Sequence, residues 1–167
     1  MRLILIRHAD AGDPHPGRYP DDRLRPLTPE GRRDHRRIAG ALARMGLAPT
    51  HLLTSPLTRA RETAAITAEA LGWTGPIEAV EGLGDQFSIG DLLERVARYA
   101  DTATLLCVGH EPHLSRFAAA LLHPDGTAKI ALPKSGMIGL ECPGTPAPGT
   151  ARLLFLLPAQ ELLRLIG

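Results

Sequence analysis

The sequence predicts an α/β fold in three layers, with a mainly parallel central sheet and helices on both faces. Short apolar runs rich in branched residues alternate with longer segments whose apolar positions recur at helical spacing, which is typical of βαβ units. The chain has 167 residues, of which 44% are hydrophobic, and this suits one domain with a substantial core. We therefore expect a single domain over residues 1–167.

Seven short runs are expected to be strands, and the last three of them to form an antiparallel edge of the sheet. Each run is bounded by turn-forming residues and is rich in the side chains that strands favour. The runs are Arg2 to Ile6, His51 to Thr54, Ile77 to Glu81, Thr104 to Val108, Lys129 to Leu132, Gly136 to Glu141 and Arg152 to Leu157.

Helices are expected between these runs, and two of their starts are marked by an N-cap hydroxyl before a proline. These starts are Thr28-Pro29 and Ser55-Pro56, where the hydroxyl accepts a free N–H and proline occupies the first helical position. In the first helix, Ile38, Leu42 and Met45 mark the expected buried stripe. The expected helices are Pro29 to Met45, Pro56 to Leu71, Ile89 to Tyr99, Pro112 to Leu122 and Ala159 to Ile166.

The charge pattern excludes several classes of protein. A net charge of +1 does not suit a nucleic-acid-binding surface or a disordered chain. Arginines cluster on the first helix, and we interpret them as a solvated face, with an anionic partner site as the alternative. These arginines are Arg32, Arg33, Arg36, Arg37 and Arg44.

Neither a membrane segment nor a disulfide framework is predicted. The apolar opening stops at Arg7, and it is shorter than the ~7 to 15 residues of a signal-peptide core or the ~20 of a membrane span. We therefore expect a cytoplasmic protein that does not bind membranes. Cys107 and Cys142 are the only cysteines and form no CxxC pair, so we expect reduced, structural thiols.

Polar clusters follow three of the predicted strands directly. Arg7 and His8 follow the first strand, Ser55 to Arg61 the second, and Gly109 and His110 the fourth. In α/β sheets, ligands bind beyond the carboxyl ends of the strands, where helix N-termini direct free N–H groups outward. We therefore expect two arginines, two histidines and two helix starts to converge at one edge of the sheet.

This collection of side chains favours a phosphate dianion as the guest. Guanidinium groups match phosphate oxygens, and the helix dipoles add positive potential. The phosphate loop motif GxxxxGK[ST] is absent, so side chains would hold the phosphate. His8 could attack phosphorus through a free ring nitrogen, while Arg7, Arg59 and a protonated His110 hold the oxygens that surround it. No cofactor and no metal is expected.

The same residues carry a resemblance to a known family. Arg7-His8-Ala9-Asp10 resembles the R-H-G/A signature of the histidine phosphatase superfamily, also called phosphoglycerate-mutase-like. The segments Thr54 to Ala64, Val108 to Glu111 and Leu27 to Gly31 are similar to its S-P-x-x-R-A-x-x-T-A, G-H and L-T-x-x-G elements, in the family's order. The resemblance implies a phosphatase with His8 as nucleophile, Arg7 and Arg59 as phosphate ligands, and His110 as the second pocket histidine.

The short length and Arg25-Pro26-Leu27-Thr28 look most like the SixA-type phosphohistidine phosphatases, in which an arginine at this place lies near the pocket. Arg25 is therefore a candidate for substrate binding, with a surface position as the alternative. Larger members carry a glutamate after the third strand, but the segment Glu81 to Asp85 does not match that pattern. Glu81 and Asp85 are the candidates for a general acid, and either could instead be an ordinary loop residue.

We therefore expect a phosphatase that acts through a phosphohistidine intermediate on phosphohistidine-bearing proteins. The first alternative is a small-molecule phosphomonoester phosphatase of the same superfamily. A non-catalytic phosphopeptide-binding module and a metal hydrolase are alternatives of other classes. The metal hydrolase would use His8, Asp10, His110, Glu111 and His113, but the nearby arginines would oppose a dication.

Overall fold

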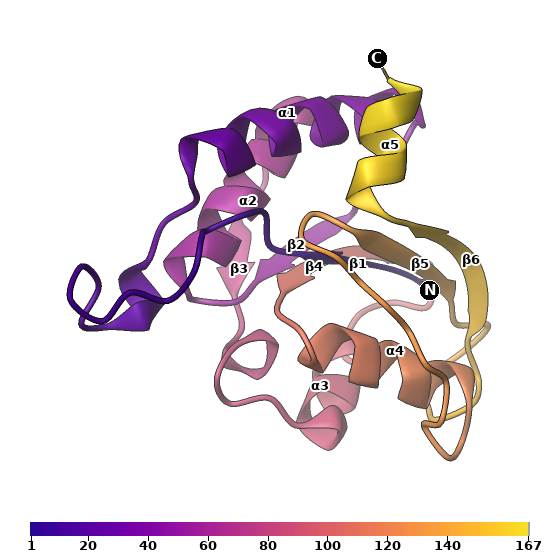
Figure 1. Ribbon diagram of the computed structural model, residues 1–167. Helices are drawn as coiled ribbons and strands as arrows, with labels where there is room; N and C mark the ends of the chain where they lie inside the picture. Colours follow the sequence, from indigo (N-terminus) through magenta and orange to yellow (C-terminus); the bar gives the residue numbers. More distant parts are fainter. Residues whose placement is uncertain (167) are drawn as a thin grey trace.

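The computed structural model describes residues 1–166, which form a six-stranded mixed sheet covered by helices on both faces (Figure 1). The strand order is β3-β2-β4-β1-β5-β6. Pairing is parallel from β3 to β1 and antiparallel from β1 to β6, which confirms the predicted α/β class and antiparallel edge. The strands are β1 (Arg2–Arg7), β2 (His51–Thr54), β3 (Ile77–Ala79), β4 (Thr104–Gly109), β5 (Met137–Glu141) and β6 (Arg152–Leu157).

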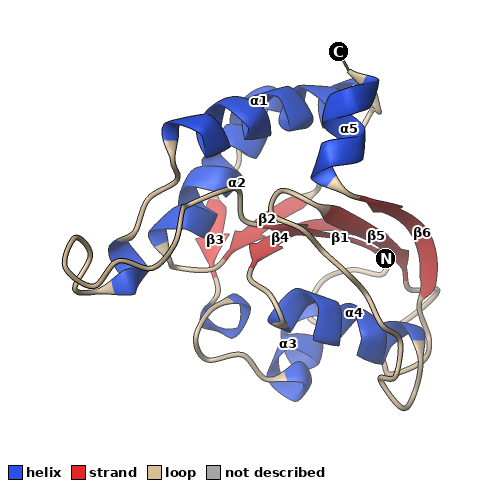
Figure 2. Ribbon diagram, viewed as in Figure 1, coloured by secondary structure: helices blue, strands red, loops and turns tan. Residues whose placement is uncertain are grey.

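The helices divide between the two faces of the sheet. Figure 2 shows α1, α2 and α5 on one face and α3 and α4 on the other. Two short 3-10 helices, η1 and η2, lie in the loops before α1 and after β3. The bounds are η1 (Asp22–Leu24), α1 (Pro29–Arg44), α2 (Thr58–Ala70), η2 (Glu81–Leu83), α3 (Ile89–Val96), α4 (His113–Leu122) and α5 (Ala159–Leu165).

Both faces of β1 are buried, as its continuous apolar run requires. Leu3 and Leu5 pack in the core beneath α3 and α4, whereas Ile4 and Ile6 pack in the core beneath α1, α2 and α5. All four are at most 1% exposed. Burying each such side chain stabilises the fold by roughly 1.5–3 kcal/mol. These two cores fix the central strand, and with it the position of the residues that follow it.

Three details of the predicted elements are wrong. Lys129 to Leu132 is an irregular segment that lies outside the sheet, because β1 already pairs with β4 on one side and with β5 on the other. Helix α2 begins at Thr58 and has no side-chain cap, since the Ser55 hydroxyl is engaged at the sheet edge. Met45 lies just after the end of α1 and is 55% exposed, whereas Ile38 and Leu42 are buried as predicted.

Two bounds also differ by more than one residue, since β3 ends at Ala79 and α3 at Val96, before the predicted Glu81 and Tyr99. Other features of the described residues agree with the sequence. Thr28 caps α1 by accepting a hydrogen bond from the N–H of Gly31. Cys107 and Cys142 are free and buried, and burial raises the pKa of the Cys107 thiol to about 12. Within residues 1–166, none of the helices combines the length and the apolar character that crossing a membrane requires.

Candidate active site

The carboxyl ends of β2, β4 and β1 lie side by side in the sheet, and they bring the predicted site residues together. Arg7 is the last residue of β1 and pairs with Gly109, the last residue of β4. The N–H of His8 donates to the Gly109 carbonyl at 3.0 Å and so extends this pairing by one residue. As a result, the His8 and His110 rings lie 4.9 Å apart between centroids.

A cleft of about 340 Å³ opens above these strand ends. It contains every residue that the sequence placed in the phosphate pocket, and it also contains Arg25 and Asp85. Its lining residues are Arg7, His8, Gly12, Asp13, Pro14, Arg25, Arg59, Gly84, Asp85, His110, Glu111, His113 and Lys134.

His8 is held as a neutral ring with a free lone pair on Nε2. Nδ1 lies 2.7 Å from the carbonyl oxygen of Ala9, and because a carbonyl only accepts, the ring hydrogen lies on Nδ1. Burial lowers the pKa of His8 to about 4, although the bond to Ala9 opposes this change. The positive charges of Arg59 and Arg7 lower it further. At neutral pH, His8 can therefore act as a nucleophile through Nε2.

His110 contacts the hydroxyl that the sequence had suggested as a helix cap. Its Nε2 lies 2.8 Å from Oγ of Ser55, and that oxygen also accepts from the N–H of Leu57 at 3.2 Å. A Cβ at Gly84 would lie 2.9 Å from the same oxygen, so the close approach of this loop requires glycine. The contact with Ser55 thereby holds the His110 ring in place beside His8.

Burial lowers the pKa of His110 to about 3, and the neighbouring His8 and Arg59 lower it further. Beside these groups His110 is therefore neutral, which differs from the protonated form expected from the sequence. The negative charge of a bound phosphate group would offset the arginines and favour the protonated ring.

Arg7 and Arg59 both line the cleft, and each guanidinium is held by a main-chain carbonyl. Nη1 of Arg7 donates to the carbonyl of Leu132 at 3.0 Å. Nη1 of Arg59, in the first turn of α2, donates to the carbonyl of Asp22 at 2.9 Å and lies 3.1 Å from its Oδ2. Burial lowers the pKa of Arg59, while the charge of Asp22 raises it. The hydrogen bond from Nη1 thus orients each guanidinium, and its other N–H groups can donate to a guest in the cleft.

Arg25 lies in the wall of the cleft and not on the surface. It is 6% exposed, and its Nε donates to Oδ1 of Asp22 at 2.7 Å. Its Nη1 donates to the carbonyls of Ala11 and Gly12 at 2.9 and 2.7 Å. Asp22 therefore bridges Arg25 and Arg59, and the hydrogen bond from Arg25 lowers the pKa of that carboxyl group. Asp22 was not anticipated as part of the site, because its second partner, Arg59, lies in α2 and is distant in the sequence.

The two candidate acids take different positions. Asp85 lines the cleft, and its Oδ2 lies 3.4 Å from Nη1 of Arg23. Glu81 lies outside the cleft lining, with its half-exposed carboxylate 3.7 Å from Nη2 of the same arginine. Arg23 therefore faces both carboxylates, and only Asp85 reaches the space that a substrate would occupy.

Two further cleft residues were not anticipated as part of a phosphate site. Lys134 lines the cleft and forms an ion pair with Asp10, whose Oδ2 accepts from the Thr28 hydroxyl at 3.0 Å. His113, the first residue of α4, stacks on the Phe87 ring at 4.5 Å between centroids. Lys134 lies three residues before Met137, the first residue of β5, and because β5 is antiparallel to β1 this start lies at the same edge of the sheet. Residues 1–166 contain no cluster of three or more His, Cys, Asp or Glu side chains arranged to hold a metal ion.

Comparisons with known proteins agree with this arrangement. A model of the histidine phosphatase superfamily (branch 1) matches residues 3–104. An uncharacterized protein of Picosynechococcus sp. is 36% identical over 172 residues, which cover 98% of this chain and 99% of that protein. The structure of the protein histidine phosphatase SixA complexed with tungstate has a TM-score of 0.84 at 21% identity and covers 97% of this chain and 99% of its own. A mutant phosphoserine phosphatase from Entamoeba histolytica in complex with phosphoserine has a TM-score of 0.69 at 18% identity, covering 96% and 98%. At these identities, the two structures show the fold.

Proposed function

The chain belongs to the histidine phosphatase superfamily and is a phosphatase, and on that premise we propose that it removes phosphoryl groups from phosphohistidine side chains of proteins through a covalent intermediate on His8. In this proposal Arg7, Arg59 and His110 hold the transferred group, and Arg25 supports them through Asp22. The reaction takes place in the cytoplasm and uses no cofactor.

The observation that carries the proposal is the set of buried nitrogens that lack a partner. Within residues 1–166, four buried side-chain nitrogens have no hydrogen-bond partner, and all four belong to residues that line the cleft. Buried polar groups are nearly always satisfied, so such a cluster is typical of a site that completes its bonds with a ligand. The atoms are Nε of Arg7, Nε of Arg59, Nδ1 of His110 and Nδ1 of His113. Arginine donors among them favour an anion.

In the first step, the lone pair on Nε2 of His8 forms a bond to phosphorus as the bond to the leaving nitrogen breaks. The leaving imidazole takes the electron pair of that bond. If its other ring nitrogen carries a proton, it departs as a neutral molecule and needs no proton at the breaking bond. Arg7 and Arg59 stabilise the charge on the oxygens during this transfer.

In the second step, water attacks the phosphorus of the phosphohistidine intermediate. The bond between phosphorus and Nε2 breaks, His8 recovers the lone pair, and the proton of the water passes to phosphate or to solvent. The Ala9 carbonyl holds the Nδ1 hydrogen throughout, so the ring returns in the form that can attack again.

The preference for phosphohistidine rests on the absence of a clear general acid. An alkoxide leaving group needs a proton in the transition state, because the pKa of its conjugate acid, the alcohol, lies far above neutral. Imidazole, whose conjugate acid has a pKa of ~6.5, does not need one. Asp85 is the candidate acid that reaches the cleft, and Arg23 holds it in an ion pair. A cleft that opens to the surface also admits a side chain that projects from another protein.

Side-by-side kinetics test the proposal. We expect kcat/KM for a phosphohistidine peptide to exceed that for 3-phosphoglycerate and for phosphoserine. After brief incubation with labelled substrate, the trapped adduct should be acid-labile and base-stable and should map to His8. Label on another residue, or turnover by His8→Ala near that of the wild type, would refute the covalent mechanism.

A small-molecule phosphomonoesterase is the second candidate, and the position of Asp85 in the cleft favours it. In that case Asp85 would protonate an alkoxide leaving group, and Asp85→Asn would lose activity on phosphate esters while keeping activity on phosphoramidates. A clear preference of the wild type for a small phosphate ester would select this candidate. Binding of a phosphohistidine peptide without any turnover would instead indicate a non-catalytic binding module.

A further inference from the structure

The segment 127–132, which connects α4 to β5, has an unpaired main chain. Within the part of the chain that the structure describes, the N–H and C=O groups of residues 127–131 form no hydrogen bonds. Thr127, Ala128, Lys129 and Ala131 are exposed. An exposed run of unpaired main-chain groups is a template on which another extended chain can pair.

The segment is nevertheless held in place by alternate side chains. Ile130 is half-buried and packs against the core beneath α3 and α4, and Leu132 belongs to that core. Lys129 lies before Ile130, Ala131 lies between Ile130 and Leu132, and both face solvent. This alternation is the pattern of a strand with one buried face, although no neighbouring strand pairs with it.

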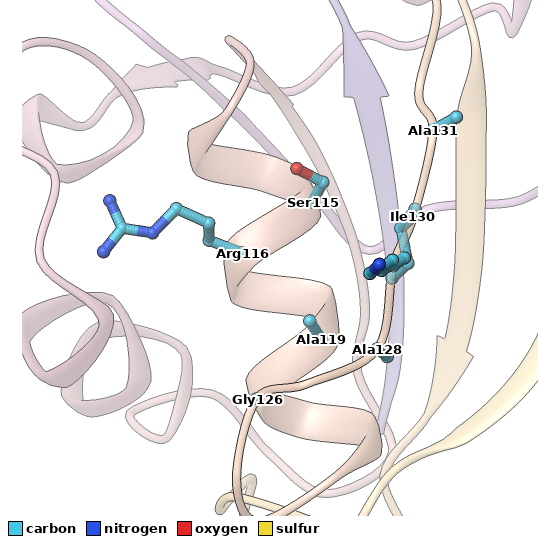
Figure 3. Close-up of a pocket in the computed structure, with 8 residues that line it drawn as sticks. Ser115, Arg116, Ala119, Gly126, Ala128, Ile130 and Ala131 are labelled. Carbon is cyan, nitrogen blue, oxygen red and sulfur yellow. The ribbon is translucent and has the colours of Figure 1, made fainter.

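A groove of about 390 Å³ runs between this segment and α4. Figure 3 shows the segment passing alongside the helix, with Ser115 and Ala119 on the helix and Ala128 and Ala131 on the segment. Because these side chains are small, the main chain of a bound peptide can approach the unpaired groups closely.

The charged residues that line the groove are both cationic. They are Arg116 and Lys129, and neither has a carboxylate partner among residues 1–166. Arg116 projects from α4 away from the segment (Figure 3), and its guanidinium lies 5.9 Å from the centroid of Phe87. An acidic guest in the groove would therefore meet the positive charge of Lys129, and no carboxylate among the described residues lines the groove to repel it.

Both walls of the groove continue along the chain to residues that line the catalytic cleft. The segment ends at Leu132, whose carbonyl accepts the hydrogen bond from Arg7. Two residues later, Lys134 lines the cleft. On the other side of the groove, α4 begins at His113, which also lines the cleft. A chain lying in the groove would thus bring a side chain near its end to the phosphate site.

We propose that this groove binds an extended, acidic stretch of the protein substrate, which pairs with segment 127–132 and directs the neighbouring phosphohistidine into the cleft. The inference rests on the proposed function, because it names the kind of protein segment that the same site accepts. Main-chain pairing supplies affinity, and Lys129 selects acidic side chains.

The test compares three phosphohistidine peptides of equal length with phosphoramidate, a small substrate that needs the cleft alone. One peptide carries glutamates beside the phosphohistidine, one carries glutamines, and the third carries the glutamates with N-methyl groups on alternate amides. We expect kcat/KM for the glutamate peptide to exceed that for the glutamine peptide by up to about fivefold, since one exposed charge pair contributes no more than this. N-methylation should remove most of the advantage, because it blocks the main-chain donors.

Variants locate the effect on the groove. Lys129→Glu should abolish the preference for the glutamate peptide, whereas the matched Lys129→Arg should keep it. Arg36→Glu, on the exposed face of α1, is the control for net charge and should also keep it. Phosphoramidate turnover and thermal melting of each variant show that the cleft and the fold are intact.

Each contrary outcome overturns a distinct statement. If the wild type cleaves all three peptides equally, or if Lys129→Glu keeps the preference, the groove does not bind the substrate but the proposed function stands. If the wild type cleaves small phosphate esters and none of the peptides, the proposed function fails and the groove assignment fails with it. If sedimentation shows a dimer that Lys129→Glu dissociates, a second copy of the chain occupies the groove, and the substrate assignment is wrong.

Discussion

Lowering the pH from 7.5 to 5.5 is expected to leave His8 in its neutral, nucleophilic form. Burial lowers its pKa to about 4, and Arg59 and Arg7 contribute in the same direction. With that pKa, about 97% of the rings are neutral at pH 5.5, whereas a histidine with the ordinary pKa of ~6.5 would be about 9% neutral. The two cases therefore differ by about tenfold in the amount of active nucleophile at this pH.

Long-range proton–nitrogen NMR of protein labelled with ¹⁵N-histidine measures both the charge and the position of the ring hydrogen. The His8 signals, assigned by their loss in His8→Gln, should show hydrogen on Nδ1 and a bare Nε2, because Nδ1 donates to the Ala9 carbonyl. We expect this form to persist until the pH approaches 4. A midpoint near 6.5, or a hydrogen on Nε2, would contradict the derived state of the nucleophile.

Activity should follow the same protonation. Because the neutral ring attacks, kcat/KM should be lost as the pH falls through about 4, and it should change little between pH 7.5 and 5.5. The second pKa of a phosphorylated substrate lies near ~6, so kcat/KM must be expressed per concentration of the dianion. A tenfold loss by pH 5.5 after that correction would mean that the cleft does not shift the His8 pKa.

Further predictions concern the groups around His8. Arg59→Lys should cause a severe loss of kcat/KM, because an ammonium cannot bond both to Asp22 and to two phosphate oxygens as the planar guanidinium can. Activity within about threefold of the wild type would exclude a bidentate role. His110→Ala should lower kcat by ~10²-fold or more while the melting temperature stays near that of the wild type. Vanadate, which resembles the trigonal-bipyramidal transition state, should inhibit at concentrations well below inorganic phosphate, and equal inhibition would argue against in-line transfer. Burial lowers the pKa of His35 in the folded protein to about 4, whereas in the unfolded chain this histidine has the ordinary pKa of ~6.5. Between pH ~6.5 and about 4 the unfolded chain therefore binds one more proton, and the free energy of unfolding should decrease by about 1.4 kcal/mol for each unit by which the pH falls. Urea unfolding at pH 6.5 and 5.0 should show a slope smaller by this amount in His35→Gln, and an unchanged slope would mean that His35 is not the titrating group.

The sequence could predict the centre of the site because that part depends on strand ends. Arg7 is the last residue of β1, His8 and His110 directly follow β1 and β4, and the sheet order places the ends of these strands together. The arginine in the first turn of α2 follows from the same rule, since α2 directly follows β2. Neighbouring strands in a parallel sheet leave little freedom in where their next residues lie.

The rim of the cleft could not be predicted in this way. Arg25 and Asp22 come from the loop between β1 and α1, and Lys134 comes from the loop before β5. Their positions depend on tertiary contacts, such as the bonds of Arg25 to the Ala11 and Gly12 carbonyls, for which loop composition carries no signal. The prediction that Ser55 caps a helix was wrong for a related reason. The N-cap pattern is read from neighbouring residues, whereas the contact of Ser55 with His110 joins residues at the ends of two different strands.

Buried hydroxyl groups beneath the cleft explain how residues so far apart in the sequence are held in register. Thr63 Oγ1 accepts from the N–H of Ala9 at 3.0 Å and donates to the carbonyl of Arg59 at 2.7 Å. One side chain therefore joins the residue after His8 to the turn of α2 that carries Arg59. Thr63, near the end of the family motif, thus has a positioning role, whereas Arg59 is the residue proposed to bind the phosphate.

His35 closes the same network from α1. Thr67 Oγ1 donates to the carbonyl of Thr63, so it must accept from Nε2 of His35, at 2.9 Å. A neutral His35 then accepts from the Ser135 hydroxyl through Nδ1, at 3.0 Å. The N–H of Ser135, a residue with a φ of 59°, in turn contacts the carbonyls of Arg7 and His8 at 3.1 and 3.2 Å. Protonating His35 would turn its Nδ1 acceptor into a donor, so the Ser135 hydroxyl would have to rotate and accept this hydrogen bond instead of donating it. Because burial lowers the pKa of His35 to about 4, this network keeps one direction of hydrogen bonding beneath the end of β1 throughout the pH range in which His8 itself stays neutral.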